Sequence, residues 1–178
     1  MKEFGGPAIF LDRSNINTDE IIPAKYLTEI SKTALKPHLL EDLLLGGQPF
    51  DSEAEEMKNA RVVVTRANFG CGSSREHAVW VFAVNDINVV VAESFARIFR
   101  QNMFNCGILA VELLPSEIET LCTMKGTISI AIDLAKDQLL ATSDDPQQQQ
   151  VICSFVINAF DKQLVAAGGW LAYADSHY

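Results

Sequence analysis

A short segment at residues 68–78 reads Asn-Phe-Gly-Cys-Gly-Ser-Ser-Arg-Glu-His-Ala and combines two glycines, two hydroxyls and a guanidinium. It follows a β-branched run at residues 61–65 and precedes an apolar stretch at residues 76–85, so the sequence predicts a strand, a turn and a helix. Backbone N–H groups at a helix start have no partner within the helix and attract anions. Arg75 can grip a carboxylate through two parallel hydrogen bonds, and the hydroxyl of Ser73 beside it is placed for proton transfer. The segment is therefore predicted to bind a small anionic substrate.

Three alternatives to anion binding share some features of this segment. Ser73 and Glu76 have the spacing of a capping box, a purely structural role that local physics leaves open. Gly70-Cys-Gly72 begins like a dinucleotide-binding motif, but Arg75 stands at the position of the third glycine and the lysine of a phosphate loop is missing. A hydrolase elbow needs glycines two residues before and two after its nucleophile, and neither Cys71 nor Ser73 has them. Nucleotide binding and covalent hydrolysis are thus disfavoured.

The composition is that of an ordinary soluble protein, with 48% hydrophobic and 21% charged residues. A length of 178 residues suits one domain with a proper core, so we expect a single domain over residues 1–178. No apolar run approaches the roughly 20 residues of a membrane span. Residues 1–6 lack the features of a secretory signal, which predicts a cytoplasmic protein without a membrane partner.

The formal charge of −9 argues against nucleic acid as a partner, because phosphate-backbone binding draws on clustered Lys and Arg. An acidic surface also repels small carboxylates at long range. A site for an anion must therefore concentrate cations locally, and Arg66 and Arg75 flank the glycine turn.

The four cysteines show no short C-x-x-C spacing, so we expect no metal site and no iron–sulfur cluster within this chain. Disulfides are equally unsupported in a chain of this size without a secretory signal. Three buried thiols and one in the turn, Cys71, are expected. His77, near the start of the predicted helix, is expected to be packed or hydrogen-bonded rather than a metal ligand.

Hydrophobic periodicity supplies the elements that must position this turn. Further strands are predicted at residues 8–11, 87–92, 108–113, 127–132, 138–142 and 151–155. Further helices are predicted at residues 36–45, 94–102 and 159–167, and from Pro115 to Gly126. Ser94 is the expected N-cap of the second helix, and Ser116 with Glu119 has capping-box spacing. Polar stretches at residues 12–19, 51–59 and 144–150 are predicted to be loops or solvated connections. Strands separated by helices in the middle, with strand-rich ends, predict an α/β domain built on a mixed sheet.

Four stretches match segments of a known family in the same order along the chain: residues 17–27, 72–78, 93–99 and 164–169. The chain resembles the swivel domain of the aconitase superfamily, and more closely the free-standing small subunits of the 3-isopropylmalate dehydratase family. The resemblance covers nearly the whole sequence and implies a swivelling β/β/α domain with a mixed, barrel-like sheet and flanking helices. It also implies half of a hydro-lyase, which isomerises 2-isopropylmalate to 3-isopropylmalate through 2-isopropylmaleate in leucine biosynthesis. The partner it implies is a large subunit that holds a 4Fe-4S cluster as Lewis acid, while this chain binds no cofactor.

The resemblance also implies roles for individual residues. Ser73 matches the catalytic base, Arg75 the anchor of a substrate carboxylate, and Ser74 a neighbouring substrate contact. Asp19 matches an active-site acid of the aconitase pattern. Lys25 stands where many small subunits have arginine, and a lysine supplies the charge but not the bidentate fork.

The segment that reads the variable part of the substrate is implied to include Tyr26, Leu27 and Thr28. An arginine after Tyr26-Leu27 accompanies substrates with an extra carboxylate, and here Thr28 and Glu29 follow, which favours an apolar substituent such as isopropyl. Lys32 lies close enough in sequence to weaken that inference. A homoaconitase or methylmalate-type hydratase, and a non-catalytic anion-binding module of the same fold, remain alternatives. Arg97, in the second helix, either lies on a solvated face or extends the anion site.

Overall fold

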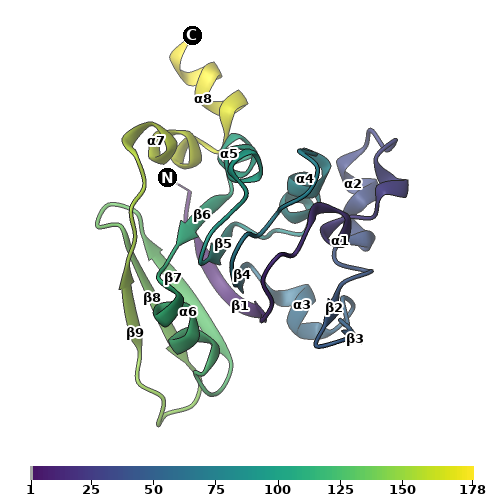
Figure 1. Ribbon diagram of the computed structural model, residues 1–178. Helices are drawn as coiled ribbons and strands as arrows, with labels where there is room; N and C mark the ends of the chain where they lie inside the picture. Colours follow the sequence, from purple (N-terminus) through teal and green to yellow (C-terminus); the bar gives the residue numbers. More distant parts are fainter. Residues whose placement is uncertain (1) are drawn as a thin grey trace.

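A seven-stranded mixed sheet with the strand order β6-β5-β4-β1-β7-β8-β9 lies at the centre of the molecule, for which a computed structural model describes residues 2–178 (Figure 1). The strands are β1 (Gly5–Leu11), β4 (Val62–Thr65), β5 (Val89–Ala92), β6 (Leu109–Glu112), β7 (Ile128–Asp133), β8 (Gln138–Ser143) and β9 (Val151–Ser154). Strands β1, β4, β5 and β6 pair in parallel, whereas β1, β7, β8 and β9 pair antiparallel. The antiparallel part curls away from the parallel part, which confirms the predicted mixed and barrel-like sheet.

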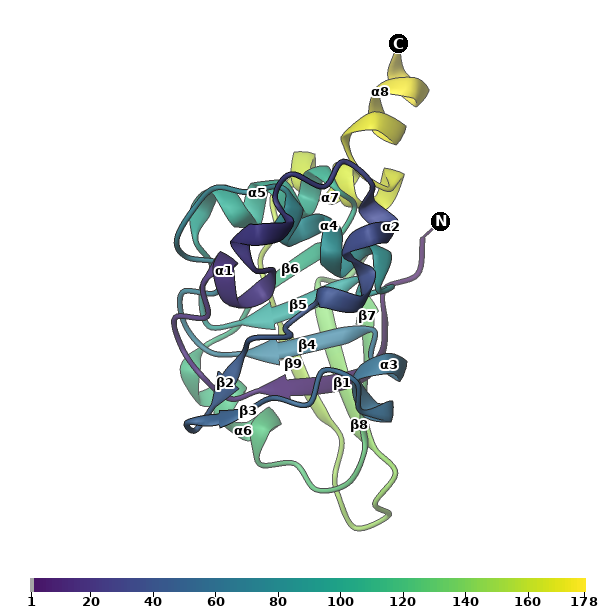
Figure 2. The same ribbon diagram turned by 90° about the vertical axis from the view of Figure 1, so that its right-hand side faces the viewer.

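Helices cover both sides of the parallel strands. Their bounds are α1 (Thr18–Ile21), α2 (Lys32–Leu35), α3 (Glu55–Asn59), α4 (His77–Val84), α5 (Arg97–Asn105), α6 (Pro115–Cys122), α7 (Ala159–Ala167) and α8 (Trp170–His177). Short 3₁₀ turns η1 (Ala24–Tyr26) and η2 (Lys36–His38) and a small hairpin of β2 (Leu44–Leu45) and β3 (Gln48–Pro49) complete the chain. Helices α4, α5 and α7 lie on one side of the sheet together with α3, and α6 lies on the other (Figure 2). Every residue of β4 and β5 is buried, as the uninterrupted β-branched runs predict.

The helix predicted at residues 36–45 is wrong. Only η2 is helical there, and Leu40 adopts a left-handed backbone conformation with φ of +59°. The N–H of Leu40 donates to the carbonyl of Ile21 at 2.9 Å instead of to a helix carbonyl. The apolar side chains of Leu39, Leu40 and Leu43 are nevertheless buried. Their helix-like spacing therefore reflects a loop folded over the core, and tertiary contacts override the local pattern.

Both predicted capping serines are also wrong. Helix α5 begins at Arg97 after Ala96, and the hydroxyl of Ser94 instead accepts the N–H of Asn68 at 2.8 Å. At the start of α6, the carboxylate of Glu117 accepts the N–H of Leu114 at 3.1 Å, which moves the cap two residues toward the N-terminus. Pro115 at the first helical position fixes that start.

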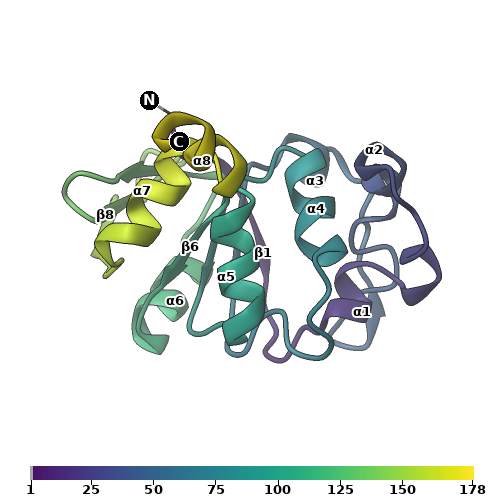
Figure 3. The same ribbon diagram turned by 90° about the horizontal axis from the view of Figure 1, so that it is seen from above.

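Three further differences concern segments with weak local signals. The polar stretch at residues 12–19 ends in helix α1, and the predicted connection at residues 51–59 contains α3, which buries Met57. Helix α8 follows the glycine pair at residues 168–169 and is not predicted by the sequence pattern. It extends away from the body of the molecule in Figures 1 and 2, and in the view from above it lies beside α7 (Figure 3). No helix in the described part of the chain is long and apolar enough to cross a membrane.

The expectation of three buried thiols is only partly right. Cys153 is buried, whereas Cys106 and Cys122 are half-buried like Cys71 in the turn. All four cysteines carry free thiols.

Candidate functional site

The glycine turn is held on one side by the loop that follows β1. The N–H of Asn15 donates to the carbonyl of Ala67 at 2.8 Å. Further along, the N–H of Gly70 donates to Ile16 at 2.9 Å, and the N–H of Thr18 donates to Cys71 at 2.9 Å. These bonds continue the parallel pairing of β1 with β4 beyond the ends of both strands.

The segment after β5 holds the turn from the other side. The N–H of Phe69 donates to the carbonyl of Ser94 at 3.1 Å, and the N–H of Ala96 donates to the carbonyl of Phe69 at 3.0 Å. Because β1, β4 and β5 are parallel, the loops after them meet at one edge of the sheet, where ligands of open α/β sheets usually bind.

Two glycines let the turn pass close to its neighbours. Gly70 has φ of +81°, and a Cβ there would lie 2.2 Å from Cγ of Phe99 in α5. Gly72 has φ of +101°, and its Cβ would lie 3.2 Å from Oγ1 of Thr18 in α1. The turn is therefore packed tightly between α1 and α5.

The structure joins two residues that the sequence assigns to the site. Nη1 of Arg75, just before α4, lies 2.5 Å from Oδ1 of Asp19 in the first turn of α1. The side chain of Asp19 is 61% exposed and that of Arg75 is 23% exposed. One edge of the guanidinium is thus held by a carboxylate, while other N–H groups of this five-donor fork stay available for a second acceptor.

The hydroxyls of Ser73 and Ser74 are exposed and, among residues 2–178, neither forms a hydrogen bond. Helix α4 has Glu76 as its N-cap, without a side-chain capping bond. The capping role that the sequence leaves open for Ser73 is therefore wrong. Both serines line a cavity of about 230 Å³ together with Gly70, Gly72 and Arg97. Two hydroxyls without a hydrogen-bond partner among the described residues therefore line this cavity.

Three residues that the sequence analysis did not assign to the site support it: Arg13, Asn17 and Glu20. Glu20 accepts bonds from both terminal nitrogens of Arg13 at 2.5 Å. Glu20 also forms a capping box with Asn17, at the start of the helix that carries Asp19. The hydrogen bonds from Arg13 hold the pKa of the Glu20 carboxyl below its usual range. The Asn-x-x-Glu spacing of residues 17–20 is a usable sequence signal for this cap.

Lys25 and Tyr26 are engaged elsewhere. The hydroxyl of Tyr26 donates to Oε1 of Glu41 at 2.7 Å, and Nζ of Lys25 lies 3.9 Å from the same oxygen. The bond to Glu41 raises the pKa of the Tyr26 phenol. Between them and Ser73 or Arg75, the described residues show no hydrogen bond or ion pair.

Leu27 is half-buried and Thr28 is exposed. The next residue, Glu29, contacts helix α4, which follows the glycine turn. There Nε2 of His77 lies 3.0 Å from the carbonyl oxygen of Glu29. The His77 ring also packs against Trp80, with ring centroids 4.5 Å apart. The expectation of a packed, hydrogen-bonded His77 is confirmed, and its contact places Glu29, the residue after Thr28, beside the start of α4.

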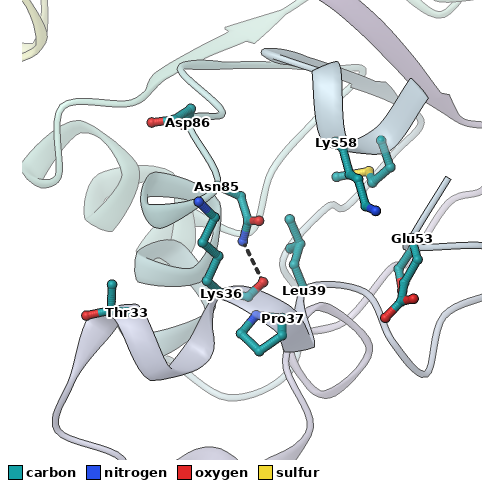
Figure 4. Close-up of a pocket in the computed structure, with 10 residues that line it drawn as sticks. Thr33, Lys36, Pro37, Leu39, Glu53, Lys58, Asn85 and Asp86 are labelled. Atoms are coloured by element: carbon teal, nitrogen blue, oxygen red, sulfur yellow. Dashed lines mark hydrogen bonds between the residues drawn. The ribbon is translucent and has the colours of Figure 1, made fainter. Parts of the chain in front are cut away.

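A larger cavity of about 610 Å³ lies at the other end of α4 (Figure 4). Lys36, Leu39, Lys58 and Asn85 contribute to its lining, and the side-chain nitrogen of Asn85 donates to the carbonyl of Lys36 at 3.1 Å. None of the site residues predicted from the sequence lines this cavity. Size alone therefore does not identify the site.

The residues present do not fit an iron–sulfur cluster. Within residues 2–178 no three His, Cys, Asp or Glu side chains are grouped to hold a metal ion. Burial raises the pKa of the Cys106 and Cys153 thiols to about 11, which favours the protonated thiol over the thiolate that such a cluster needs.

Comparison with known proteins adds independent evidence on the family to which the chain belongs. The family model of the aconitase C-terminal domain matches residues 2–116. The 3-isopropylmalate dehydratase small subunit of Shouchella clausii is 34% identical over 172 residues, which span 93% of this chain and 83% of that protein. The subunit of the same name from Leptospira interrogans is 39% identical over 76% of this chain and 72% of its own length. A crystal structure of 3-isopropylmalate dehydratase from Methanocaldococcus jannaschii superimposes with a TM-score of 0.75 at 28% identity, covering 99% of this chain and 95% of that one.

Proposed function

The chain belongs to the family of aconitase C-terminal domains, and from that membership we propose that it is the small subunit of a dehydratase that interconverts 2-isopropylmalate and 3-isopropylmalate. The intermediate is 2-isopropylmaleate, and the reaction serves leucine biosynthesis in the cytoplasm. The partner is a large subunit that carries a 4Fe-4S cluster, and the name small subunit that the relatives bear supports such a partner. Residues 1–178 act as one swivel domain that supplies its half of the active site.

One observation carries the proposal: the free hydroxyl of Ser73 lines a cavity, and Arg75, two residues further along the chain, is paired with Asp19. Ser73 takes a proton from C3 of 2-isopropylmalate as hydroxide leaves C2, which gives the alkene. When hydroxide then adds at C3, Ser73 returns the proton to C2. A serine can act as base only if its alkoxide is stabilised, and the start of α4 together with the Arg75 guanidinium provides positive potential for this.

Arg75 anchors one substrate carboxylate through the N–H groups that Asp19 leaves open, and Ser74 donates a further hydrogen bond. Asp19 fixes the orientation of the guanidinium through the 2.5 Å contact. As the active-site acid it gives a proton to the hydroxide that leaves C2, which departs as water, and it takes a proton back when water adds at C3. A rigid fork of this kind binds carboxylates more selectively than a lysine does.

The segment of Lys25, Tyr26, Leu27 and Thr28 reads the substituent of the substrate. A hydratase of substrates with a third carboxylate is the alternative, and Lys32 is the residue that favours it. However, Nζ of Lys32 lies 5.1 Å from the centre of the Trp80 ring, where a cation–π contact engages it. An apolar substituent therefore fits this segment better than a charged one.

A substrate panel on a reconstituted complex tests the proposal. The chain is co-expressed with a cluster-bearing large subunit and assayed with 2-isopropylmalate, 3-isopropylmalate, homoaconitate, citrate and methylmalate. We expect turnover of the two isopropylmalates by the complex and none by the isolated chain. Activity of the isolated chain would refute the two-subunit account, and a preference for homoaconitate would favour the alternative. An assembled complex inactive on the whole panel would favour the non-catalytic module.

A further inference from the structure

The cavity at Ser73 has an unusual charge for this molecule. Among residues 2–178, Arg97, the first residue of α5, is the one charged side chain that lines it. The chain as a whole carries a formal charge of −9, yet no carboxylate of the described residues lines this space. A cavity with one cation and two hydroxyls favours an anionic ligand.

Arg97 is also the arginine without a partner in the described part of the chain. Four of the others donate hydrogen bonds to carboxylates or backbone carbonyls: Arg13, Arg61, Arg66 and Arg75. Arg100 forms an ion pair with Glu112, with Nε 3.7 Å from Oε1. Arg75 is held by Asp19 and does not line the cavity. The guanidinium at the Ser73 cavity is therefore that of Arg97, and it is free to bind.

The backbone fixes Arg97 relative to Ser73. Ala96, the residue before it, donates its N–H to Phe69 at 3.0 Å, on the strand segment that leads into the turn. Two residues after Arg97, the ring of Phe99 packs directly against Gly70. Ser73 and Arg97 thus extend from segments that are held together by a backbone hydrogen bond and by side-chain packing. Their relative position is therefore fixed, as a preorganised site requires.

We infer that Arg97 is a second carboxylate-binding residue of this site, so that Arg75 and Arg97 each bind one carboxylate of a small dicarboxylate, with Ser73 between them. This inference rests on the proposed function for the identity of the ligand. Two guanidiniums match the two negative charges of a dicarboxylate, and each pairs with a carboxylate in a planar bidentate geometry.

Kinetics of the reconstituted complex test this role. Arg97→Gln should raise KM for isopropylmalate by about tenfold or more, since a charge-assisted pair is lost. Arg97→Lys should have a KM between those of the unaltered protein and Arg97→Gln, because lysine keeps the charge but not the bidentate fork. In both variants kcat should change much less than KM. Lys136→Gln, which removes one exposed positive charge from the hairpin turn between β7 and β8, is the matched control and should leave KM unchanged. Gel filtration reports whether the variants still assemble.

A binding experiment on the full chain keeps this test independent of turnover. Malonate is titrated into ¹⁵N-labelled protein, with acetate as the monocarboxylate comparison. We expect shifts of Gly70, Gly72, Ser73 and Arg97 signals with malonate, strongly weakened in Arg97→Gln. If that loss is seen while the complex fails on isopropylmalate, the inference stands and the proposed function falls. If Arg97→Gln changes neither malonate binding nor KM, or weakens only assembly with the large subunit, the inference is overturned.

Discussion

The side chains of Ser73 and Arg75 are two positions apart in sequence but differ in their hydrogen-bond partners. Arg75 is tied to Asp19 at 2.5 Å, whereas the hydroxyl of Ser73 has no partner among residues 2–178. A side chain with no structural bond costs little stability when it is truncated, so the stability and the activity of a Ser73 variant separate cleanly. This separation decides between a catalytic and a structural serine.

Ser73→Ala should therefore lower kcat of the reconstituted complex by at least about a hundredfold, as expected for loss of a general base. KM and the free energy of unfolding should change little, because the hydroxyl neither caps α4 nor pairs within the described fold. Steady-state kinetics and thermal unfolding of the same preparations provide the measurement. Ser74→Ala is the control and should act mainly on KM. An unchanged kcat with stability reduced by about 1 kcal/mol would return Ser73 to a capping role.

At the scale of single elements, α1 matters most, since this four-residue helix carries Asp19. Its cap depends on Glu20, whose pKa is lowered by the bonds from Arg13. A lowered folded-state pKa means that the contribution to stability is present above the ordinary value of 4.5 and is lost as pH falls through the lower folded-state value. The site should thus loosen in acid before the sheet unfolds.

Glu20→Gln should cost about 1 to 2 kcal/mol at pH 7, since it weakens charge-assisted bonds to a pair that is largely shielded from solvent. The difference from the unaltered protein should shrink as pH falls below 4.5, where protonation of Glu20 has the same effect as the substitution. Denaturant unfolding of both proteins between pH 3 and pH 7 measures this. A difference that stays constant over that range would contradict the coupling.

The close approach of the turn to α5 gives a second prediction for an element. Gly70→Ala should destabilise by about 3 kcal/mol, because it adds both left-handed strain and overpacking. The new methyl group would lie 2.2 Å from Cγ of Phe99. Gly46→Ala is the matched control, with φ of +57° and nothing within 4 Å of the added atom, and strain alone should cost about 1 kcal/mol there. Equal losses in thermal unfolding of the two variants would show that the packing against α5 is not tight.

The elements also show what local sequence can and cannot predict. The β-branched runs of β4 and β5 and the regular hairpin of β7 and β8 are predictable because burial and alternation act over a few residues. The fold of residues 36–45 is not, since Leu40 bonds to Ile21, far away in sequence. Likewise, the hydroxyl of Ser94, after β5, accepts a hydrogen bond from the N–H of Asn68, after the neighbouring strand β4. For the site, Ser73, Arg75 and Asp19 follow from motif resemblance, whereas the contacts of each need the structure.

At the scale of the whole molecule, all these contacts gather at one edge of the parallel sheet. The loops after β1, β4 and β5 meet there, while β8 and β9 lie at the far end of the strand order. In the proposed two-subunit enzyme, the surface that supplies half of the active site faces the partner, so the sheet edge with the cavity is the side expected to meet the large subunit. Two exposed isoleucines distinguish the two regions: Ile98 beside the cavity is 51% exposed, and Ile152 in β9 is 61% exposed.

Ile98→Glu should therefore weaken assembly with the large subunit by about tenfold or more, because a carboxylate would have to be buried without a partner at an apolar contact. Ile152→Glu makes the same chemical change on a similarly exposed residue and should leave assembly unchanged. Isothermal titration of each variant with the large subunit compares them, with thermal unfolding as the check that both remain folded. An effect of Ile152→Glu alone would place the partner on the antiparallel part of the sheet and leave the Ser73 cavity open to solvent in the complex. Equal weakening by the two variants would contradict an interface confined to the sheet edge with the cavity.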